Sequence, residues 1–575
     1  MRSNFLGNIS HKNLNAKSLP AGTWLWVIPV LYLALFFFYP LISILTLTQG
    51  PGSVGVFSTT QLSRIWSPLV FTVWQALLST ILTMVLGLPA AFVFGRYLFN
   101  GKRLLRTLTT LPFILPTVVV AAGFNALLGP RGLINLLLMQ WFNLSKPPVQ
   151  ILNTLGAILL AHVFYNTTVI IRVVGSAWSQ LDQRQEHAAR VLGANPFRTL
   201  VEVTLPLLRP SLQAAALLVF LFDFTSFGVI LLMGGPQFST LEVEIYIQAM
   251  QMLNLPLAGL LSVIQLICTL ALTFLYSRIT AGRSVPLTPR LRGEGMRRPA
   301  GWRQHLFVGC VVIVLLVLLV SPMAALAVRS ITRLDPERGQ RGEITTGWTL
   351  DYYRELFINR RQSIFYVPPI AAVRNSLAYA ALTVGITLVV GILAASALSR
   401  PLRINRFLDP LLMLPLGTSA VTLGLGFLIV FNRPPFSVRS FPFLIPIVHS
   451  LVALPFVVRT VLPALISIPV SLRHAAAVLG ASPWQVWLKV VLPIISRALI
   501  TSGVLAFTVS LGEFGATSFL ARPEYPTLPI AIFNYLSQPG ALNYGQAMAM
   551  ATLLMIVCGV SILIIEKLQT NGEFL

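Results

Sequence analysis

Charged residues are scarce in this chain, and their scarcity excludes most soluble folds. Only 10% of the 575 residues are Asp, Glu, Lys or Arg, whereas 55% are hydrophobic, and the mean hydropathy is +0.79. A soluble domain carries roughly a quarter charged residues, because its surface must face water. Most side chains here must therefore face lipid or other apolar segments, and the lipid bilayer is the first expected partner.

Two further kinds of pattern are missing. The chain has only three cysteines, Cys268, Cys310 and Cys558, and each lies in an apolar stretch without CxxC or Cys/His spacing. We therefore predict buried thiols, no metal site and no cofactor. The sequence also lacks the phosphate loops GxxxxGKS and GxxxxGKT, so the chain cannot bind ATP in the usual way.

Basic residues outnumber acidic ones by 41 to 17, which gives a formal net charge of +24. In a soluble protein this excess would suggest nucleic-acid binding. Here the basic residues fall in short runs between apolar segments, which is the distribution that orients a membrane protein. We therefore expect no nucleic-acid partner.

A membrane-spanning helix needs about 20 apolar residues, and the chain holds twelve stretches of that kind. We predict an all-α membrane protein with breaks in spans three and nine at Pro112, Pro116, Pro415 and Gly424. The twelve predicted spans lie near residues 24–47, 69–95, 107–128, 154–176, 211–233, 257–279, 306–328, 375–398, 407–431, 441–464, 498–520 and 544–565.

Lys and Arg gather in alternate loops. Short loops such as 96–106 and 400–406 are rich in Arg, whereas loop 234–256 holds no Lys or Arg. Under the positive-inside rule the basic loops are cytoplasmic. Residues 1–22 are polar and basic, and the apolar stretch after them is too long for a signal peptide. We predict a multi-pass protein of the inner cell membrane with both termini in the cytoplasm.

The sequence repeats itself on either side of a polar, Arg-rich segment, 280–303, which has the composition of a cytoplasmic linker. Residues 161–197 align without gaps on residues 448–484, so that residue n matches residue n + 287. We predict an N-terminal half, 1–279, and a C-terminal half, 304–575. Each half has six spans, an even number, so the halves are parallel repeats that point the same way in the membrane.

The loop after the fourth span of each half is the most informative segment. Residues 181–206 and 468–493 are each predicted to form two short helices separated by Gly-Ala-Asn-Pro or Gly-Ala-Ser-Pro, because Gly ends a helix well and Pro opens the next. Such a loop suits a groove on a partner protein. Its small apolar face comprises Ala188, Ala189, Leu192 and Phe197 in one half, and Ala475, Ala476, Leu479 and Trp484 in the other.

These loops carry a family resemblance. Two alanines, then a glycine, then Leu-Pro resemble the EAA signature of permeases of binding-protein-dependent ABC importers. The family's Glu, six residues before the glycine, is replaced here by His, although the neighbouring Glu could substitute for it in the first half. The resemblance implies a MetI-like fold and docking on two cytoplasmic ATPase subunits through Glu186, His187, Ala188, Ala189, Gly193, Pro196, His474, Ala475, Ala476, Gly480 and Pro483.

The resemblance also implies a transport subunit rather than an enzyme. An extracytoplasmic binding protein would deliver the solute, the partner ATPase would hydrolyse ATP, and the solute would cross by alternating access. Segments 161–166, 234–246, 510–515 and 525–533 resemble the thiamine and ferric-iron permeases of this family. That likeness implies a cationic cargo, thiamine or ferric iron.

Ionisable residues inside spans are candidate functional residues, because a charge in lipid is costly. Asp223 in span five and Glu513 in span eleven either line the translocation path and favour a cation, or bond across helices and hold packing. The cores of these spans have no Lys or Arg, which disfavours an anion such as phosphonate. His162 and His449 are expected to form hydrogen bonds between helices.

Two other classes of membrane protein are alternatives. An ion-coupled secondary transporter also has twelve spans in parallel halves, but it needs buried carboxylate or His relays and has no use for paired docking loops. An integral-membrane enzyme needs acidic or His residues clustered at one membrane face, and the sequence shows no such cluster.

Overall fold

The computed structural model describes residues 23–47, 59–281, 296–333, 347–358, 367–432 and 443–570. Within these ranges it has 11 helices long and apolar enough to cross a membrane, or up to 12 if one bent helix pair counts as a span. The predicted all-α membrane class is confirmed. The N-terminal tail, 1–22, and most of the predicted linker, 282–295, lie outside the described residues.

The first repeat is built from apolar helices whose backbone groups are satisfied within each helix, as lipid requires. Its first span runs without interruption from a 3-10 turn through a π turn. In chain order the elements are η1 (Thr23–Trp26), α1 (Val27–Leu33), η2 (Ala34–Phe38), α2 (Tyr39–Leu47), α3 (Thr59–Arg96), α4 (Lys102–Ile114), α5 (Thr117–Leu128), α6 (Leu133–Phe142), α7 (Leu155–Gln180), α8 (Gln183–Val191), α9 (Pro196–Thr199), η4 (Leu200–Thr204), α10 (Leu205–Phe224), α11 (Gly228–Met233), α12 (Leu241–Tyr246), η5 (Ile247–Gln251) and α13 (Leu255–Ala281).

The second repeat follows the same order. Its first span is one uninterrupted helix, and a short helix, α15, follows it. The elements are α14 (Trp302–Ser330), α15 (Asp351–Glu355), α16 (Pro369–Leu398), α17 (Asn405–Gly417), α18 (Ala420–Phe431), α19 (Leu444–Ile466), α20 (Val470–Val478), α21 (Pro483–Val486), η6 (Trp487–Val491), α22 (Leu492–Gly512), α23 (Thr517–Leu520), α24 (Leu528–Leu536) and α25 (Ala541–Thr570).

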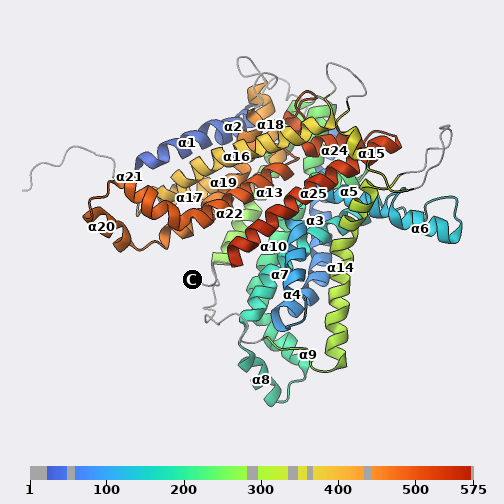
Figure 1. Ribbon diagram of the computed structural model, residues 1–575, viewed down its shortest axis with the longest axis horizontal. Helices are drawn as coiled ribbons and strands as arrows, with labels where there is room; N and C mark the ends of the chain where they lie inside the picture. The colour runs from blue at the N-terminus through green and yellow to red at the C-terminus, as the bar shows by residue number, and fades with distance from the viewer. Residues whose placement is uncertain are drawn as a thin grey trace, which may run out of the picture.

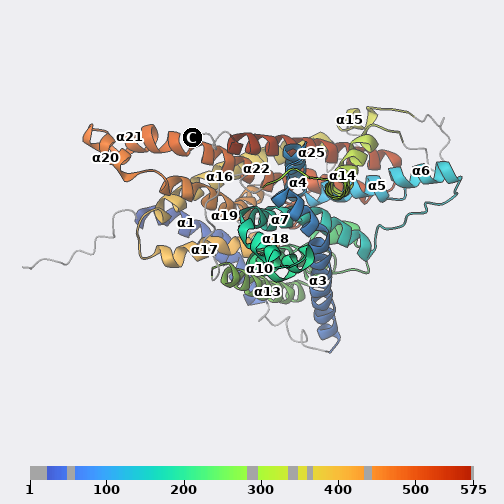
Figure 2. The same ribbon diagram turned by 90° about the horizontal axis from the view of Figure 1, so that it is seen from below.

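The two repeats form two legs that diverge from a shared end of the molecule (Figure 1). Helices α3, α7 and α10 run toward α8 and α9, whereas α16, α19 and α22 run toward α20 and α21. From below, α7 and α10 are seen nearly end-on while α16 and α22 lie across the view (Figure 2). The two candidate docking loops, residues 181–206 and 468–493, therefore lie at separate ends of the molecule.

The first helix of each repeat packs on the other repeat. The span that begins at η1 packs on the second repeat, where the Trp26 indole donates to Asn405 Oδ1 (3.1 Å) and the Tyr32 hydroxyl donates to the Ile447 carbonyl (2.9 Å). Reciprocally, α14 packs on α3, α4 and α5. The last helices follow the same rule, because α13 packs on α2, α17 and α18 while α25 packs on α14, α4 and α5. The two sequence repeats thus interlock in space.

The third span of each repeat is broken rather than merely kinked. The breaks fall at Leu115 and Pro116 after α4, and at Thr418 and Ser419 after α17, where ψ lies between 133° and 141°. Leu115 leaves the helical region because a residue that precedes proline avoids it. Helices α17 and α18 meet at 96°. The break predicted at Pro116 is confirmed, whereas Pro112 and Pro415 lie inside α4 and α17.

The predicted fifth and eleventh spans, 211–233 and 498–520, are shifted in the structure. Each membrane helix begins inside a docking loop, because α9, η4 and α10 form one continuous helix over 196–224, and α21, η6 and α22 form another over 483–512. Pro206 does not stop the first of these helices, since the π turn η4 comes directly before it. Each docking loop and the span that follows it are parts of one rod.

Gly424 is not a break, contrary to the expectation from sequence. It lies inside the regular helix α18, where a Cβ would stand 2.7 Å from the Cα of Ala516 and 3.0 Å from its carbonyl oxygen. The glycine instead allows α18 to approach the backbone that leads into α23.

Replacing Gly424 with Ala should lower the thermal stability of the purified protein. The nearest atom that the methyl group would meet is the backbone Cα of Ala516, which cannot yield as a side chain can, and overpacking of this kind costs about 1–3 kcal/mol. Gly385→Ala is the matched control, since nothing lies within 4 Å of a Cβ at that position of α16. Thermal unfolding in detergent measures both variants, and equal midpoints would show that α18 has room at Gly424.

Candidate docking loops and translocation path

Each candidate docking loop consists of a short helix, a glycine turn and a second short helix. α8 ends before Gly193 and α20 before Gly480, and these glycines have φ angles of +90° and +84°. Nothing lies within 4 Å of a Cβ at either position, so the backbone conformation alone favours glycine there. The next helix begins at Pro196 or Pro483 behind a side-chain cap.

The apolar face of each loop is exposed. Leu192 and Leu479 are each 87% exposed, and no residue of α8 or α20 is buried. Exposed apolar side chains that gather in one place mark interaction sites. On the two loops these side chains are Val191, Leu192 and Phe197, and Val478, Leu479 and Trp484.

Glu186 faces the helix bundle rather than the exposed face. Its carboxylate pairs with Arg96 at the end of α3 and accepts a hydrogen bond from Thr204 Oγ1 (2.9 Å). His187 is exposed, and so is His474 in the other loop. Glu186 therefore ties the first docking loop to α3. Sequence reasoning did not foresee this pair, because Arg96 lies 90 residues earlier in the chain.

The second docking loop is held to its own repeat by different contacts. Arg473, which matches Glu186 under the repeat offset, donates to the Leu465 carbonyl (3.2 Å). The ring of Trp484 stacks on Trp487 with centroids 5.6 Å apart and an interplanar angle of 6°. The two loops thus share their shape and apolar face but not the side chains that brace them.

Inside the membrane, each repeat holds a buried histidine beside a buried carboxylate. In the first repeat His162 Nδ1 lies 3.4 Å from Asp223 Oδ1, and His162 Nε2 lies 2.8 Å from Ser226 Oγ. Asn166 Nδ2 donates to the same carboxylate (2.6 Å), and Gln75 Nε2 donates to the backbone carbonyl of Asp223 (2.8 Å). This group joins α3, α7 and α10.

The second repeat contains the same group with its acid and its hydroxyl exchanged. His449 Nδ1 lies 2.8 Å from Ser510 Oγ, and His449 Nε2 lies 3.3 Å from Glu513 Oε2. Under the repeat offset Ser510 matches Asp223 and Glu513 matches Ser226. The different registers of the two acids therefore converge on equivalent histidines. The predicted hydrogen bond between helices is confirmed for His449, which bonds Ser510 on α22, whereas His162 bonds Ser226 in the turn after α10.

The two acids differ in how fully their oxygens are bonded. Glu513 accepts from the backbone N–H groups of Ala516 (2.8 Å) and Thr517 (3.0 Å), and from the Thr517 hydroxyl (2.6 Å). Asp223 is 1% exposed and its Oδ2 has no hydrogen-bond partner. Both acids lie where a long helix ends, before α11 and before α23. Their contact with cargo stays a prediction.

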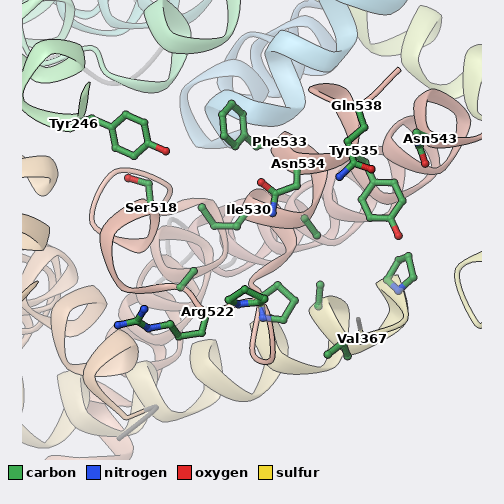
Figure 3. A pocket seen from close by; sticks show the side chains of 16 residues that line it. Tyr246, Val367, Ser518, Arg522, Ile530, Phe533, Asn534, Tyr535, Gln538 and Asn543 are labelled. Carbon is green, nitrogen blue, oxygen red and sulfur yellow. The ribbon is translucent and has the colours of Figure 1, made fainter. Parts of the chain in front are cut away.

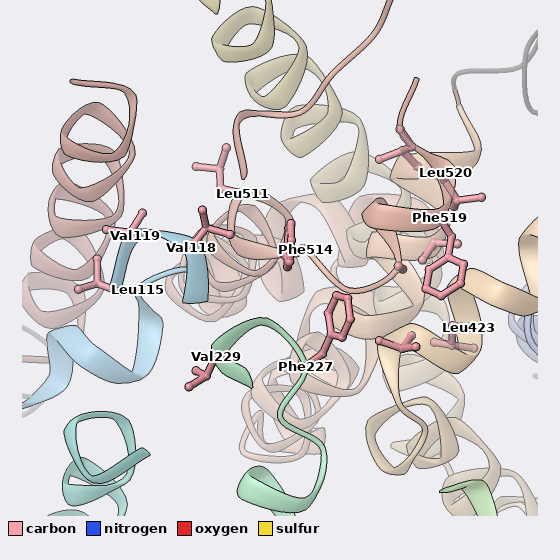
Figure 4. Packing of buried hydrophobic residues seen from close by; sticks show 14 of the residues in the cluster. Leu115, Val118, Val119, Phe227, Val229, Leu423, Leu511, Phe514, Phe519 and Leu520 are labelled. Carbon is pink, nitrogen blue, oxygen red and sulfur yellow. The ribbon is translucent and has the colours of Figure 1, made fainter. Parts of the chain in front are cut away.

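Between the repeats lies an aromatic cluster that sequence reasoning did not identify (Figure 4). Phe227 stacks on Phe514 with centroids 5.5 Å apart and an interplanar angle of 25°. Tyr246 packs edge-on against Phe227 (5.5 Å), and Phe533 packs edge-on against Phe514 (5.6 Å). Under the repeat offset Phe227 matches Phe514 and Tyr246 matches Phe533. The alignment of FTSFG on LGEFG held the signal, since Phe227 and Phe514 coincide in it.

Comparison with known proteins decides the family. Residues 83–283 and 387–571 each match the family described as "Binding-protein-dependent transport system inner membrane component". The chain belongs to this family. It is an inner-membrane permease in which two copies of the family domain are fused, as the repeat and the docking-loop pattern predicted.

The permease resembles several named proteins over nearly all or about half of its length. The thiamine transport system permease protein ThiP of Salmonella typhimurium is 27% identical over 94% of this chain and 96% of its own length. PhnU of the same organism, named provisionally for 2-aminoethylphosphonate transport, is 30% identical over 45% of this chain and 93% of its own. A solved chain of a bacterial alginate ABC transporter is 19% identical, with a TM-score of 0.38, and covers 45% of this chain and 94% of its own length.

Replacing Gly193 or Gly480 of the permease with Val should disturb the docking loops without preventing membrane insertion. A β-branched residue disfavours φ near +90°, whereas Asn tolerates it, so Gly→Asn variants are the matched controls. Membrane abundance, co-purified ATPase and solute uptake are to be measured. We expect near-normal abundance with at least severalfold lower ATPase association or uptake for the Val variants. Unchanged uptake in both would show that residues 181–206 and 468–493 are ordinary connectors.

The exchanged acid and hydroxyl can be tested within one repeat. Asp223→Ser should lower thermal stability by about 1–3 kcal/mol, because the Asn166 side chain loses its buried acceptor. Adding Ser226→Glu recreates the order of the second repeat and should recover most of that loss. Thermal midpoints of the purified variants measure the effect. A double variant as unstable as Asp223→Ser alone would contradict the equivalence of the two groups.

Proposed function

We propose that this permease supplies both transmembrane halves of an ATP-driven importer. Two cytoplasmic ATPase subunits dock on residues 181–206 and 468–493, and an extracytoplasmic binding protein delivers cargo to the opposite face. The observation that carries the proposal is that two loops, matched residue by residue, present exposed apolar faces at the ends of the two legs (Figure 1). Both termini lie in the cytoplasm with these loops.

Force from the ATPase reaches the membrane along the two rods. The rod over 196–224 begins in the first docking loop and ends three residues before Phe227, and the rod over 483–512 ends just before Phe514. A helix transmits displacement along its axis because its hydrogen bonds keep its length fixed. When the ATPase draws the docking loops together, the rods turn about the shared end of the legs and separate Phe227 from Phe514.

The aromatic cluster is the closed gate of this cycle. Phe227 and Phe514 are 5% and 3% exposed, so their rings leave no open passage between the repeats at this level. Their contact is apolar, and its separation exposes apolar surface to water, which costs about 25 cal/mol per Å². Energy from ATP and from the docked binding protein supplies that cost during transport. Between cycles the same cost keeps the gate closed.

The cargo we propose is an organic cation of the thiamine type. The relative that matches nearly the whole chain is named for thiamine, and 2-aminoethylphosphonate, in the name of the half-length relative, also carries a positively charged nitrogen. Asp223 and Glu513 lie within four residues of the gate phenylalanines and place two carboxyl groups beside the path. The relatives reported above are not named for ferric iron, the other cargo implied by the sequence.

The importer proposal predicts the composition of the complex. One copy of this chain should purify with two ATPase subunits, because it carries two docking loops. Native mass spectrometry of the complex measures the ratio. Proteoliposomes that contain the complex measure thiamine uptake driven by ATP or by an ion gradient across the membrane. A complex with two copies of this chain, or uptake driven by a gradient without ATP, would reject the proposal in favour of another assembly or a secondary transporter.

A further inference from the structure

A cavity of about 380 Å³ lies in the second repeat beside the gate (Figure 3). Its walls come from α24, the loop before it, and the starts of α16 and α25. Tyr246 and Phe533 line the cavity and also belong to the aromatic cluster. α24 lies at the shared end of the legs, away from both docking loops (Figure 1). A solute released at that end would meet this cavity before it reached the gate.

The lining has the chemistry of a small-molecule site for an anionic group. Arg522 is its one charged residue, and none of the described residues that line it is acidic. The Nε of Arg522 is buried and makes no hydrogen bond, which leaves a donor whose desolvation is not offset. Neutral polar groups and aromatic rings complete the wall: Ser518, Asn534, Gln538 and Asn543, with Tyr246, Phe533 and Tyr535.

We propose that this cavity is a cargo-receiving subsite in which Arg522 binds an anionic group, a phosphate ester, a phosphonate or a carboxylate, of a small organic solute. The planar guanidinium matches such groups with two parallel hydrogen bonds, and the aromatic rings contact the flat part of the solute. The volume is within the usual range for small-molecule pockets. The subsite rests on the proposed function. A ring-bearing cation that also carries an anionic group satisfies both the cationic cargo proposed above and this subsite.

Matched probe pairs test the subsite directly. The purified complex of permease and ATPase in nanodiscs, without a binding protein, is titrated with thiamine against thiamine monophosphate, and with ethanolamine against 2-aminoethylphosphonate. Saturation-transfer NMR measures each dissociation constant. We expect the phosphorus-bearing member of each pair to bind at least about tenfold more tightly, as one charge-assisted contact allows.

Variants assign the difference to Arg522. Arg522→Gln should abolish the preference and Arg522→Lys should retain part of it. Arg354→Gln, which removes a charge from an exposed position on α15, should leave it unchanged. Equal affinities within each pair, or a preference that survives Arg522→Gln in a protein of unchanged thermal midpoint, would overturn the subsite.

One further measurement shows whether the anionic group belongs to cargo or to a lipid headgroup. A second distinguishes failure of the importer proposal from failure of the subsite. If sn-glycerol 1-phosphate binds as tightly as thiamine monophosphate, the cavity recognises a lipid headgroup and the cargo assignment is overturned. ATP-dependent uptake into proteoliposomes that contain the same complex, with the binding protein supplied on the side that faces away from the ATPase, tests the importer separately. Normal probe selectivity without ATP-dependent uptake would reject the proposed function, whereas normal uptake without probe selectivity would reject the subsite alone.

Discussion

The stacking of Phe227 on Phe514 fixes how the two repeats are arranged. In an assembly with two-fold symmetry, a residue can touch its own counterpart only on the symmetry axis. These two phenylalanines are counterparts under the repeat offset, and their rings lie 5.5 Å apart, so they mark the pseudo-two-fold axis of the fused chain. The edge-on contacts of Tyr246 and Phe533, the exchange of first helices and the divergence of the legs are all arranged about that axis.

The low-dielectric interior imposes the second constraint, since a buried charge must find partners within the protein. Both repeats meet it with a histidine, an acid and a hydroxyl at the end of a long helix. The acid stands at one position in the first repeat, Asp223, and three residues later in the second, Glu513. What the repeats share is therefore the geometry around His162 and His449 rather than the order of the residues. Glu513 follows the last residue of α22, where the backbone is already extended, and this turn of the chain brings its carboxylate to His449.

The sequence allowed prediction of the features that depend on local pattern. Apolar stretches located most of the spans, the gapless alignment located the repeat, and the glycine and proline residues located the turns of the two candidate docking loops. Prediction failed where the outcome depended on contacts distant in sequence. The pair of Glu186 with Arg96 bridges two helices, the close approach of Gly424 to Ala516 is set by packing, and the π turn that carries a helix past Pro206 has no local signature.

The fusion of the two halves into one chain permits a departure from symmetry that the function can use. In a homodimer every cavity off the axis occurs twice, with identical walls. Here Arg522 matches Gly235, whose φ of +68° suits glycine, so the guanidinium that lines the cavity of the second repeat has no counterpart at the matched position of the first. Glu242, which is buried on α12, likewise matches a different kind of residue, Pro529. A solute that enters on one side of the axis then meets a positive group in one repeat and buried carboxylates in both. A single asymmetric solute can thereby be bound in one orientation within an almost symmetric frame.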